Sequence, residues 1–394
     1  MLSSLPTHYD TLGVMPSAEP EEVRQAYRKL AREYHPDINP DPKAHEAMAQ
    51  INVAFEVLSD PVRRMEYDAV IGHSLASEPG RPTSAPTRVQ AVYARVLHRH
   101  TVHGTPVYGV AYDQASGRLV SSSFDNELIW WSAGDEFAER RLKLDGGVVS
   151  TIQTGPRGVV VAAGSTEQTL ACWKVGSGRP ATWRQTPKEW ICSLKPSPDA
   201  ESLALGTVDN IVRVLSADTG ATRWQLAAHD DSVTALAWSV DSQWLATGGA
   251  DASIKIWCGT TGRELLKIDQ IRSAVTALCF SPDGKWLAAA GVDLTVRVFG
   301  TEDGGLKQTF FGHEKPIEAL AFHPRSWLLG SASRDGNIGL WNVRRGVDHG
   351  RIEASHQPIS CLAFSPTGLR MASGGLDKVL RIWELSSTPE ESRS

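Results

Sequence analysis

The chain of 394 residues has the composition of an ordinary globular protein, with 41% hydrophobic residues, 22% charged residues and a formal net charge of −5. This length exceeds what one typical domain needs, so we expect a multidomain protein. No stretch approaches the 18 uninterrupted apolar residues of a membrane span, and the N-terminus lacks the pattern of a secretory signal. Five cysteines, scattered singly, favour reduced thiols and a cytoplasmic location.

Two amphipathic helices are predicted within the first 70 residues, over residues 19–34 and 43–59. Each carries an apolar stripe with the 3.6-residue period of an α-helix. The stripes consist of Val23, Ala26, Tyr27, Leu30, Ala31 and Tyr34 in the first helix, and of Ala44, Ala47, Met48, Ile51, Phe55 and Leu58 in the second. Shorter helices are expected around residues 9–12 and 61–70. The four elements predict a small all-α domain over residues 1–71.

The tripeptide His35-Pro36-Asp37 separates the two long helices. A proline disfavours the helical conformation of the residue before it, so the first helix should end near Tyr34. An imidazole and a carboxylate are then presented at the tip of a helical hairpin. By itself this tripeptide is also compatible with an ordinary turn.

Three segments in this region resemble the J domain of DnaJ-type co-chaperones: HYDTLGV (8–14), AYRKLAREYHPD (26–37) and AFEVLSDPVRRMEYD (54–68). The resemblance implies that His35, Pro36 and Asp37 contact a DnaK-type heat-shock ATPase and trigger ATP hydrolysis in that partner. It also implies that a basic face of the first long helix docks on an acidic surface of the partner. That face consists of Arg24, Arg28, Lys29 and Arg32.

The basic face has a simpler interpretation as a solvated helix surface, because residues 1–70 hold 7 basic and 12 acidic residues. The zinc-binding cysteine module and the Gly/Phe-rich segment of some DnaJ-type proteins are absent from the sequence. If the resemblance holds, an unrelated domain supplies targeting. Residues 72–88 contain Ser, Gly and three prolines and predict a flexible linker, and residues 386–394 predict a disordered tail.

From residue 89 onward the sequence repeats every 42 residues. An aromatic or apolar residue closes the third predicted strand of each repeat, at Trp131, Trp173, Leu215, Trp257, Phe299, Trp341 and Trp383. Six residues before each of these positions lies an acid, at Asp125, Glu167, Asp209, Asp251, Asp293, Asp335 and Asp377. A seven-fold register without drift predicts a repeat architecture.

Each repeat predicts four short strands, for example over residues 233–238, 244–247, 253–257 and 264–268. Four strands in about 40–45 residues resemble a WD repeat. The resemblance implies an all-β domain, a seven-bladed β-propeller over residues 89–385. The last repeat has only three strands, and the alternating stretch 91–97 is expected to supply its missing outer strand.

The WD resemblance also implies buried hydrogen-bond chains of Trp, Ser or Thr, His and Asp in four repeats. These are His103, Ser121, Asp125 and Trp131; His229, Thr247, Asp251 and Trp257; His313, Ser331, Asp335 and Trp341; and His356, Ser373, Asp377 and Trp383, in which the histidine is one residue out of phase. The second, third and fifth repeats lack the histidine and the hydroxyl, so apolar packing should hold them. We interpret these acids and histidines as structural rather than catalytic.

The histidines His98, His100 and His103 are close enough in sequence to suggest a metal site, but strand alternation favours separate roles. We expect no metal and no cofactor. The residues just before the repeated acids should lie near one mouth of the ring. They are Phe124, Thr166, Val208, Ala250, Val292, Arg334 and Leu376. Of these, Phe124, Val208, Val292, Arg334 and Leu376 form a candidate protein-binding face, and local packing within each turn is an equal alternative.

The sequence therefore predicts a monomeric J-domain co-chaperone, not itself an enzyme, whose propeller binds a client protein or complex. An interaction scaffold with the J domain as a recruitment tag is the alternative. A third possibility, an enzyme that uses the central channel, has no supporting set of acids. Residues after 70 hold 33 basic and 33 acidic residues, which argues against nucleic-acid binding, and no membrane partner is expected.

Overall fold

The computed structural model describes residues 7–15, 18, 20–34, 42–59, 64, 67, 92–113, 116–144, 149–154, 160–166, 169–175, 183–187 and 189–386. The chain divides into two compact units, Met1–Thr87 and Arg88–Ser394. We describe each unit by itself.

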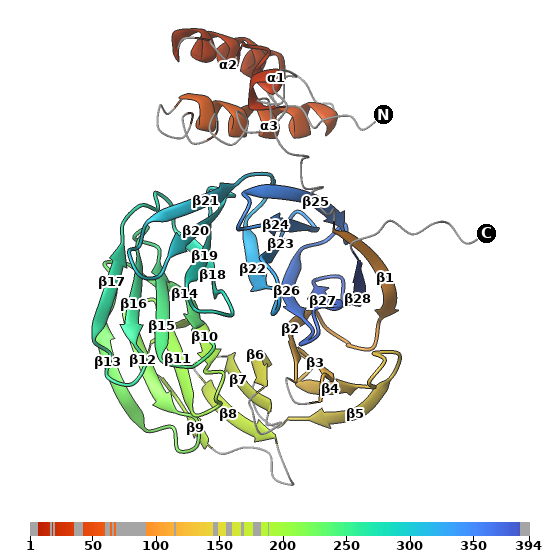
Figure 1. Cartoon of the computed structure of the whole chain (residues 1–394), viewed down its shortest axis with the longest axis vertical. Coiled ribbons are helices and arrows are strands. Elements are labelled where there is room, and N and C mark those ends of the chain that lie inside the picture. Colours follow the sequence, from red (N-terminus) through yellow and green to blue (C-terminus); the bar gives the residue numbers. More distant parts are fainter. Residues whose placement is uncertain are drawn as a thin grey trace, which may run out of the picture. The chain divides into compact units, whose positions relative to one another are not determined.

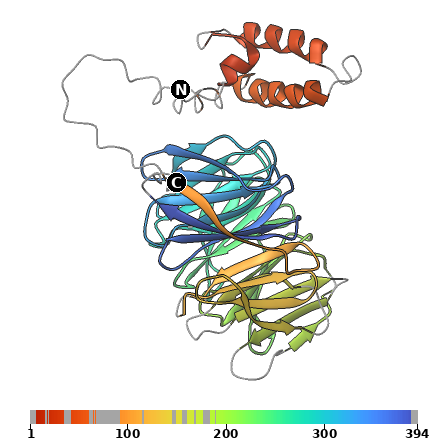
Figure 2. The ribbon, with the colours of Figure 1, turned by 90° about the vertical axis from the view of Figure 1, so that its right-hand side faces the viewer.

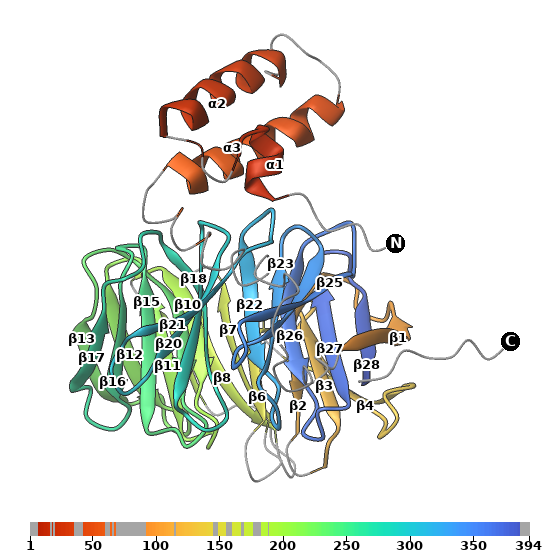
Figure 3. The ribbon, with the colours of Figure 1, turned by 45° about the horizontal axis from the view of Figure 1, so that its top comes forward.

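The first unit contains three described helices, α1 (His8–Leu12), α2 (Pro20–Tyr34) and α3 (Pro42–Ser59). Their positions confirm the helices predicted around residues 9–12, 19–34 and 43–59. The long helices α2 and α3 lie side by side, and α1 packs against α3 (Figure 3). None of the described helices combines the length and apolar character needed to cross a membrane.

A capping box starts α1, which the sequence reading did not predict. The Thr7 hydroxyl accepts a hydrogen bond from the Asp10 N–H at 3.1 Å, and the Asp10 carboxylate accepts one from the Thr7 N–H at 2.8 Å. Gly13 ends the helix with a φ of 65°, a left-handed conformation that glycine adopts without strain. The capping box and Gly13 therefore define both ends of α1, which has only five residues.

The core of the helical unit combines residues from all three helices. Tyr9, Val23, Ile51 and Leu58 are buried there. Tyr67, described beyond the end of α3, accepts a hydrogen bond from the His8 N–H at 2.7 Å and so ties the start of α1 to the far end of the unit. Of the last helix predicted for this unit, over residues 61–70, only positions 64 and 67 lie within the described residues.

The described strands of the second unit form seven four-stranded antiparallel sheets arranged around a common centre, as in a β-propeller (Figures 1 and 2). In chain order the sheets are as follows: β2 (Val107–Tyr112), β3 (Leu119–Ser123), β4 (Glu127–Trp131) and β5 (Ala138–Lys143); β6 (Val149–Thr154), β7 (Val160–Thr166), β8 (Thr169–Val175) and β9 (Trp183–Gln185); β10 (Ile191–Pro196), β11 (Ser202–Thr207), β12 (Ile211–Ser216) and β13 (Thr222–Ala227); β14 (Val233–Trp238), β15 (Trp244–Gly249), β16 (Ile254–Cys258) and β17 (Glu264–Ile268); β18 (Val275–Phe280), β19 (Trp286–Gly291), β20 (Val296–Gly300) and β21 (Leu306–Phe310); β22 (Ile317–Phe322), β23 (Leu328–Ser333), β24 (Asn337–Asn342) and β25 (Val347–Glu353); and β26 (Ile359–Phe364), β27 (Arg370–Gly375) and β28 (Leu380–Ser386) with β1 (Tyr93–His100).

The seventh sheet joins the two ends of the ring. Its strand order is β1-β28-β27-β26, and β1 runs antiparallel to β28 with His100 opposite Leu380. An ion pair of 2.8 Å between Arg95 and Glu384 spans the same pair of strands. The stretch predicted to complete the last repeat is therefore confirmed as its outer strand. Closure in this way pairs the edge of β28 that the last repeat alone would leave open.

Neighbouring sheets pack through their buried apolar faces. One cluster joins Ile254 of the fourth sheet to Val275 and Phe299 of the fifth. A Cβ atom on Gly248 would lie 2.5 Å from Cγ1 of Val275, so the close approach of the two sheets requires glycine there. This packing holds β2, β6, β10, β14, β18, β22 and β26, which we call the inner strands, around the centre of the ring.

Candidate functional site

The basic residues of α2 lie on its exposed side. The side chains of Arg24, Arg28 and Lys29 are exposed, whereas Val23 is buried against the rest of the helical unit. Arg24 and Arg28 are four residues apart and so share one helix face. Arg32 belongs to the same helix, but its side chain lies outside the described part of the structure. The exposed basic face has the position that the sequence predicts.

The tripeptide His35-Pro36-Asp37 lies outside the described residues. The helices on either side are described: α2 ends at Tyr34 and α3 begins at Pro42. The helix end predicted from Pro36 stays a prediction, because the residues directly after Tyr34 lie outside the described part of the chain. In the chain the tripeptide falls between the two helices of the hairpin.

Three of the four predicted hydrogen-bond chains form in the ring. In the fourth sheet the Trp257 indole N–H donates to the Thr247 hydroxyl at 2.9 Å, and that hydroxyl lies 2.7 Å from Nε2 of His229. Nδ1 of His229 lies 3.1 Å from the Asp251 carboxylate, which also accepts a hydrogen bond from the Asp230 N–H at 2.9 Å. The corresponding contacts occur in the first and sixth sheets, through His103, Ser121, Asp125 and Trp131 and through His313, Ser331, Asp335 and Trp341.

These histidines are buried, and their polar atoms are satisfied within each chain. Burial lowers the pKa of His103 and of His229, and the neighbouring carboxylates Asp125 and Asp251 oppose that effect. A satisfied, buried chain rigidifies the turn that contains it. The geometry supports a structural role for both histidines.

The prediction for the seventh sheet is wrong in one residue. His356 is exposed in the bend between β25 and β26 and does not join the chain, because it is one residue out of phase with the histidines of the other chains. Ser355 takes the in-phase position and donates to the Asp377 carboxylate at 2.6 Å. The guanidinium of Arg381 pairs with the same carboxylate at 2.5 Å. The bond from the Trp383 indole to the Ser373 hydroxyl, at 2.9 Å, forms as predicted.

The fifth sheet also departs from the expectation of purely apolar packing. Arg297 forms an ion pair of 2.8 Å with Asp293, and the two side chains are only 6% and 3% exposed. In both this sheet and the seventh, an arginine four residues after the repeated acid replaces the missing histidine as its partner. The third sheet has an arginine at the same position, Arg213, which instead donates to Gln225 at 2.9 Å. The four-residue spacing between acid and arginine could have predicted the pairs in the fifth and seventh sheets from the sequence.

Of the three closely spaced histidines, His98 and His100 stack on each other, whereas His103 has a separate environment. Nε2 of His100 lies 2.7 Å from the backbone carbonyl of Asp135, and the ring of His100 stacks at 5.7 Å on that of His98. His103 belongs to the hydrogen-bond chain of the first sheet. The position of His103 in that chain agrees with its predicted phase in the repeat.

A polar network links the first and seventh sheets, and sequence reasoning missed it. The carboxylate of Asp135, which is buried, pairs with Arg370 at 3.0 Å and accepts a hydrogen bond from the Tyr112 hydroxyl at 3.5 Å. Burial raises the pKa of Asp135, and Arg370 opposes that effect. The pair connects residues 235 positions apart in the chain, so local patterns gave no sign of it.

Exposed apolar side chains directly follow the second strands of four sheets, β3, β11, β19 and β27. Phe124, Val208, Val292 and Leu376 are 38–49% exposed, as predicted for the candidate protein-binding face. Ala250 is half-buried, and the side chain of Thr166 lies outside the described residues. Arg334, the predicted basic member, is exposed and forms an ion pair with Glu318.

One large member of this face was missed. The Val208 N–H donates to the carbonyl of Trp190 at 2.9 Å, so Trp190 lies beside Val208, and its side chain is 67% exposed. Corresponding backbone bonds join Val292 to Ala274 and Leu376 to Pro358. The repeat register could therefore have found Trp190. We call the set of Phe124, Trp190, Val208, Val292 and Leu376 the rim patch.

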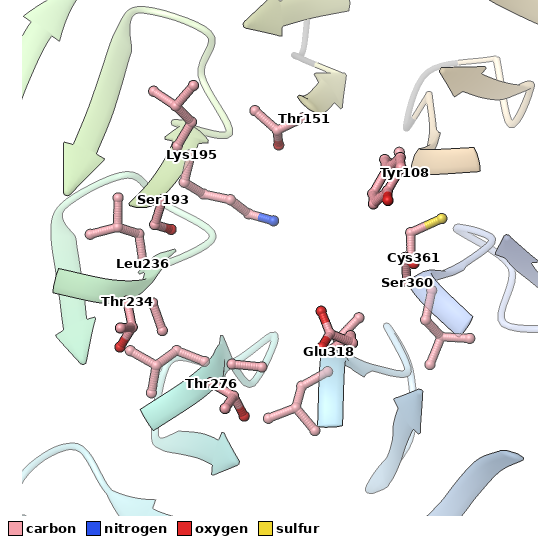
Figure 4. Close-up of a pocket in the computed structure, with 18 of the residues that line it drawn as sticks. Tyr108, Thr151, Ser193, Lys195, Thr234, Leu236, Thr276, Glu318, Ser360 and Cys361 are labelled. Atoms are coloured by element: carbon pink, nitrogen blue, oxygen red, sulfur yellow. The ribbon is translucent and has the colours of Figure 1, made fainter. Parts of the chain in front are cut away.

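The inner strands enclose a cavity of about 450 Å³ at the centre of the ring (Figure 4). Tyr108 lines it and stacks on Phe124 of the rim patch, with ring centroids 4.0 Å apart. Glu318 lines it as well and pairs with Arg334. Tyr108 of the cavity wall therefore contacts Phe124 of the rim patch directly.

Comparison with known families covers both units. A model of the DnaJ domain matches residues 7–68, and a model of the WD domain, G-beta repeat, matches residues 94–132, 220–258, 264–300, 304–342 and 350–384. This chain carries a DnaJ domain and WD repeats. The matched repeats omit β6–β9 of the second sheet and β10–β12 of the third, two repeats whose sequences lack the histidine and hydroxyl of the hydrogen-bond chain.

Curated relatives share similarity over a length close to that of the DnaJ domain. Chaperone protein DnaJ of Dictyoglomus thermophilum is 54% identical over 66 residues, which is 17% of this chain and 17% of that protein. Chaperone protein DnaJ 1 of Aquifex aeolicus is 50% identical over 74 residues, 19% of this chain and 20% of that protein. Chaperone protein DnaJ of Thermosynechococcus vestitus is 57% identical over 60 residues, 15% of this chain and 16% of that protein. The chain thus spans a fifth or less of the length of these relatives.

Proposed function

We propose that this protein is a co-chaperone that stimulates the ATPase of a DnaK-type chaperone and brings that activity to a protein bound by its propeller. The observation that carries the proposal is the DnaJ domain at residues 7–68, which includes His35-Pro36-Asp37 between α2 and α3. The similarity to proteins named chaperone protein DnaJ supports it. ATP chemistry then belongs to the partner, and this chain is not itself an enzyme and needs no cofactor.

The exposed basic face of α2 supports docking on an acidic surface of the partner. Arg24, Arg28 and Lys29 are exposed on the helix that leads to the tripeptide. Opposite charges steer the encounter of two proteins and favour one orientation. In this proposal the basic face aligns the partner, and His35-Pro36-Asp37 triggers hydrolysis.

The propeller supplies the second half of the proposed function. The rim patch exposes two aromatic and three aliphatic side chains, a composition typical of protein-binding surfaces. The sequence of residues 72–88 favours a flexible linker with a coil span of roughly 20–25 Å, which would keep the J domain at high local concentration near a bound client. We propose a cytoplasmic monomer whose partners are proteins rather than nucleic acids or membranes.

The steady-state ATPase rate of a DnaK-type chaperone tests the proposal. Catalytic amounts of the full chain should raise that rate, and the variants Asp37→Asn and His35→Gln should abolish the increase. Asp41→Asn is the matched control, since asparagine caps a helix as well as aspartate and the charge change is the same. Unchanged thermal unfolding would show that the variants fold, and unchanged stimulation would contradict the proposal.

The rim patch also supports a scaffold function in which the J domain is only a recruitment tag. The two functions differ in what depends on residues 1–71. Affinity purification with the full chain and with residues 89–394 separates them. Under the co-chaperone proposal, a DnaK-type protein is lost from the shorter chain while propeller partners remain. Recovery of the same partners with both chains, without any DnaK-type protein, would favour the scaffold.

A further inference from the structure

The sixth sheet carries a cluster of arginines at one end of its strands. Arg325 lies in the turn between β22 and β23, and Arg344 and Arg345 lie in the turn between β24 and β25. In an antiparallel sheet the first and third turns lie at the same end, opposite the second turn. The members of the rim patch other than Trp190 lie in second turns, so the three arginines belong to the other face of the ring.

The sixth repeat reverses the charge that other repeats carry at these positions. Counting in steps of 42 residues, the equivalents of the three arginines include five acids, Asp199, Asp241, Asp283, Glu302 and Asp303. Asp241 and Asp283 each accept a hydrogen bond of 2.6 Å from a serine of their own turn. In the sixth sheet the Arg325 N–H donates instead to Nδ1 of His323 at 3.1 Å. The turn therefore forms without the Arg325 side chain, and its formation does not explain the arginine.

The positive charge of this cluster is not neutralised within the described part of the chain. All three arginine side chains are exposed, and none forms an ion pair with a described residue. The Arg344 guanidinium lies 5.8 Å from the ring centroid of Trp327, and the Val343 N–H donates to the Trp327 carbonyl at 2.9 Å. These contacts join the two turns and position one guanidinium while it keeps its charge.

Two large apolar side chains are exposed on the same face. Leu369, in the turn between β26 and β27, is 63% exposed, and Phe137, in the turn between β4 and β5, is 60% exposed. The position of Leu369 carries a polar residue in the third, fourth and fifth repeats, at Glu201, Gln243 and Lys285. Apolar side chains exposed beside polar ones are typical of protein-binding surfaces.

Contacts across the sheet boundaries join these turns into one surface. Nε2 of His323 in the sixth sheet lies 3.1 Å from the carbonyl of Gly368 in the seventh. Arg370 of the seventh sheet pairs at 3.0 Å with Asp135, in the turn of the first sheet that also carries Phe137. We call this surface the turn patch, defined by Arg325, Arg344, Arg345, Leu369 and Phe137.

We propose that the turn patch binds an acidic segment of a protein partner that also carries large apolar side chains. Guanidinium groups bind carboxylates through charge-assisted hydrogen bonds, which fits the arginines of the sixth sheet. Apolar side chains of the same segment would cover Leu369 and Phe137, and burial of such groups supplies affinity. This inference adds a second surface to the partner-binding half of the proposed function and rests on it.

The neighbouring turns favour a short acidic segment over a nucleic acid. Asp283, Glu302 and Asp303 are exposed in the equivalent turns of the fifth sheet and would repel a long row of phosphates. The chain's own residues 387–394 are a rival occupant, because they contain Glu390 and Glu391. They follow β28, where the Leu385 N–H donates to the Leu369 carbonyl at 2.9 Å. A second copy of the chain is another rival.

Selection from a displayed library of random dodecapeptides tests the chemistry of the occupant. The full chain is the target, and binders to the triple variant Arg325→Gln, Arg344→Gln and Arg345→Gln are removed. Recovered peptides should combine Asp or Glu with Leu, Phe or Trp. Recovery of no peptide, or of peptides without net negative charge, would overturn the proposal.

Matched variants then locate the binding of a recovered peptide by fluorescence anisotropy. The triple variant, and separately Leu369→Ser, should weaken its binding by about tenfold. The controls are Arg263→Gln and Val240→Ser, which alter an exposed arginine and an exposed valine in turns of the fourth sheet on the same face, and they should leave binding unchanged. Equal losses in the variants and the controls would overturn the proposal.

Three further outcomes would assign the turn patch to another occupant and so overturn the proposal. A chain that ends at Ser386 would bind the peptide about tenfold more tightly if the tail were the occupant. Sedimentation would show a dimer that Leu369→Ser dissociates if the occupant were a second copy. A single-stranded DNA dodecamer would bind as tightly as the peptide if the surface took nucleic acid. These measurements contain no DnaK-type protein, so their failure is distinct from failure of ATPase stimulation.

Discussion

The helical unit and the ring use charged side chains in opposite ways. In the ring, the acids that repeat along the sequence are largely enclosed, as where Asp251 meets His229 and Asp293 meets Arg297. On α2, Arg28 and Lys29 remain exposed. The difference teaches that a charge whose partners lie within its own sheet stabilises the fold, whereas a charge held at a surface is available to another protein.

The largest expected effect breaks a buried ion pair. Arg297→Met leaves the Asp293 carboxylate buried without its cation, so the free energy of unfolding should fall by about 3 kcal/mol. Arg213→Met is the matched control, because Arg213 occupies the same position in the third sheet but contacts Gln225 at 2.9 Å and the partly exposed Glu189 at 3.8 Å, so that no fully buried carboxylate loses its cation and the cost should be about 1 kcal/mol. Urea denaturation measures both. Equal losses of unfolding free energy in the two variants would contradict a larger contribution from the buried pair of Arg297 with Asp293.

The next prediction compares the unfolding free energy lost when each of two histidines of the repeats is replaced. His229→Ala removes a buried partner from both Thr247 and Asp251, which should cost about 2 kcal/mol of unfolding free energy. His356→Ala should cost almost nothing, since its side chain is exposed. The same denaturation experiment tests the pair. A large loss of unfolding free energy with His356→Ala would contradict the exposed position of His356 and support the hydrogen-bond chain that the sequence predicts for the seventh sheet.

A pH effect is expected in the helical unit. Burial lowers the pKa of His8 from 6.5 to about 4, and its ring stacks on Tyr67 at 4.4 Å. The unfolded chain therefore binds a proton that the folded chain does not, so stability should fall as the pH decreases from about 6.5 to about 4. Thermal unfolding across this range, compared with His8→Asn, measures the change. An identical pH dependence in both proteins would exclude His8 as the cause.

The smallest effect lies at the closure of the ring. Arg95 and Glu384 pair at 2.8 Å, but their side chains are 55% and 45% exposed. Such surface pairs contribute little, so Arg95→Ala should reduce the unfolding free energy by about 0.5 kcal/mol or less. Backbone pairing of β1 with β28 holds the junction instead. A cost of several kcal/mol in chemical denaturation would contradict that assignment.

Much of the fold could be predicted because local patterns determine it. The stripe through Val23 and the proline at position 36 were enough to place α2, and β14 and β17 begin and end at the residues predicted. The closing strand followed from counting strands in the last repeat. These features depend on periodicity and turn chemistry, which are written along the chain.

The site was harder to predict because it depends on side chains that meet across the ring. The exposure of Trp190 has meaning only beside Val208, to which its backbone is bonded. Ser355 and Arg381 bind Asp377 in place of the expected His356, which is exposed in the bend between β25 and β26. The pair of Asp135 with Arg370 joins distant parts of the chain, which periodicity does not report.

The most direct test of the central claim compares Asp37→Asn with His229→Ala in single-turnover ATP hydrolysis by a DnaK-type chaperone, at a temperature where both variants remain folded. The account predicts that Asp37→Asn loses the acceleration given by the unaltered chain, whereas His229→Ala keeps it. Equal acceleration by Asp37→Asn and the unaltered chain would contradict the account.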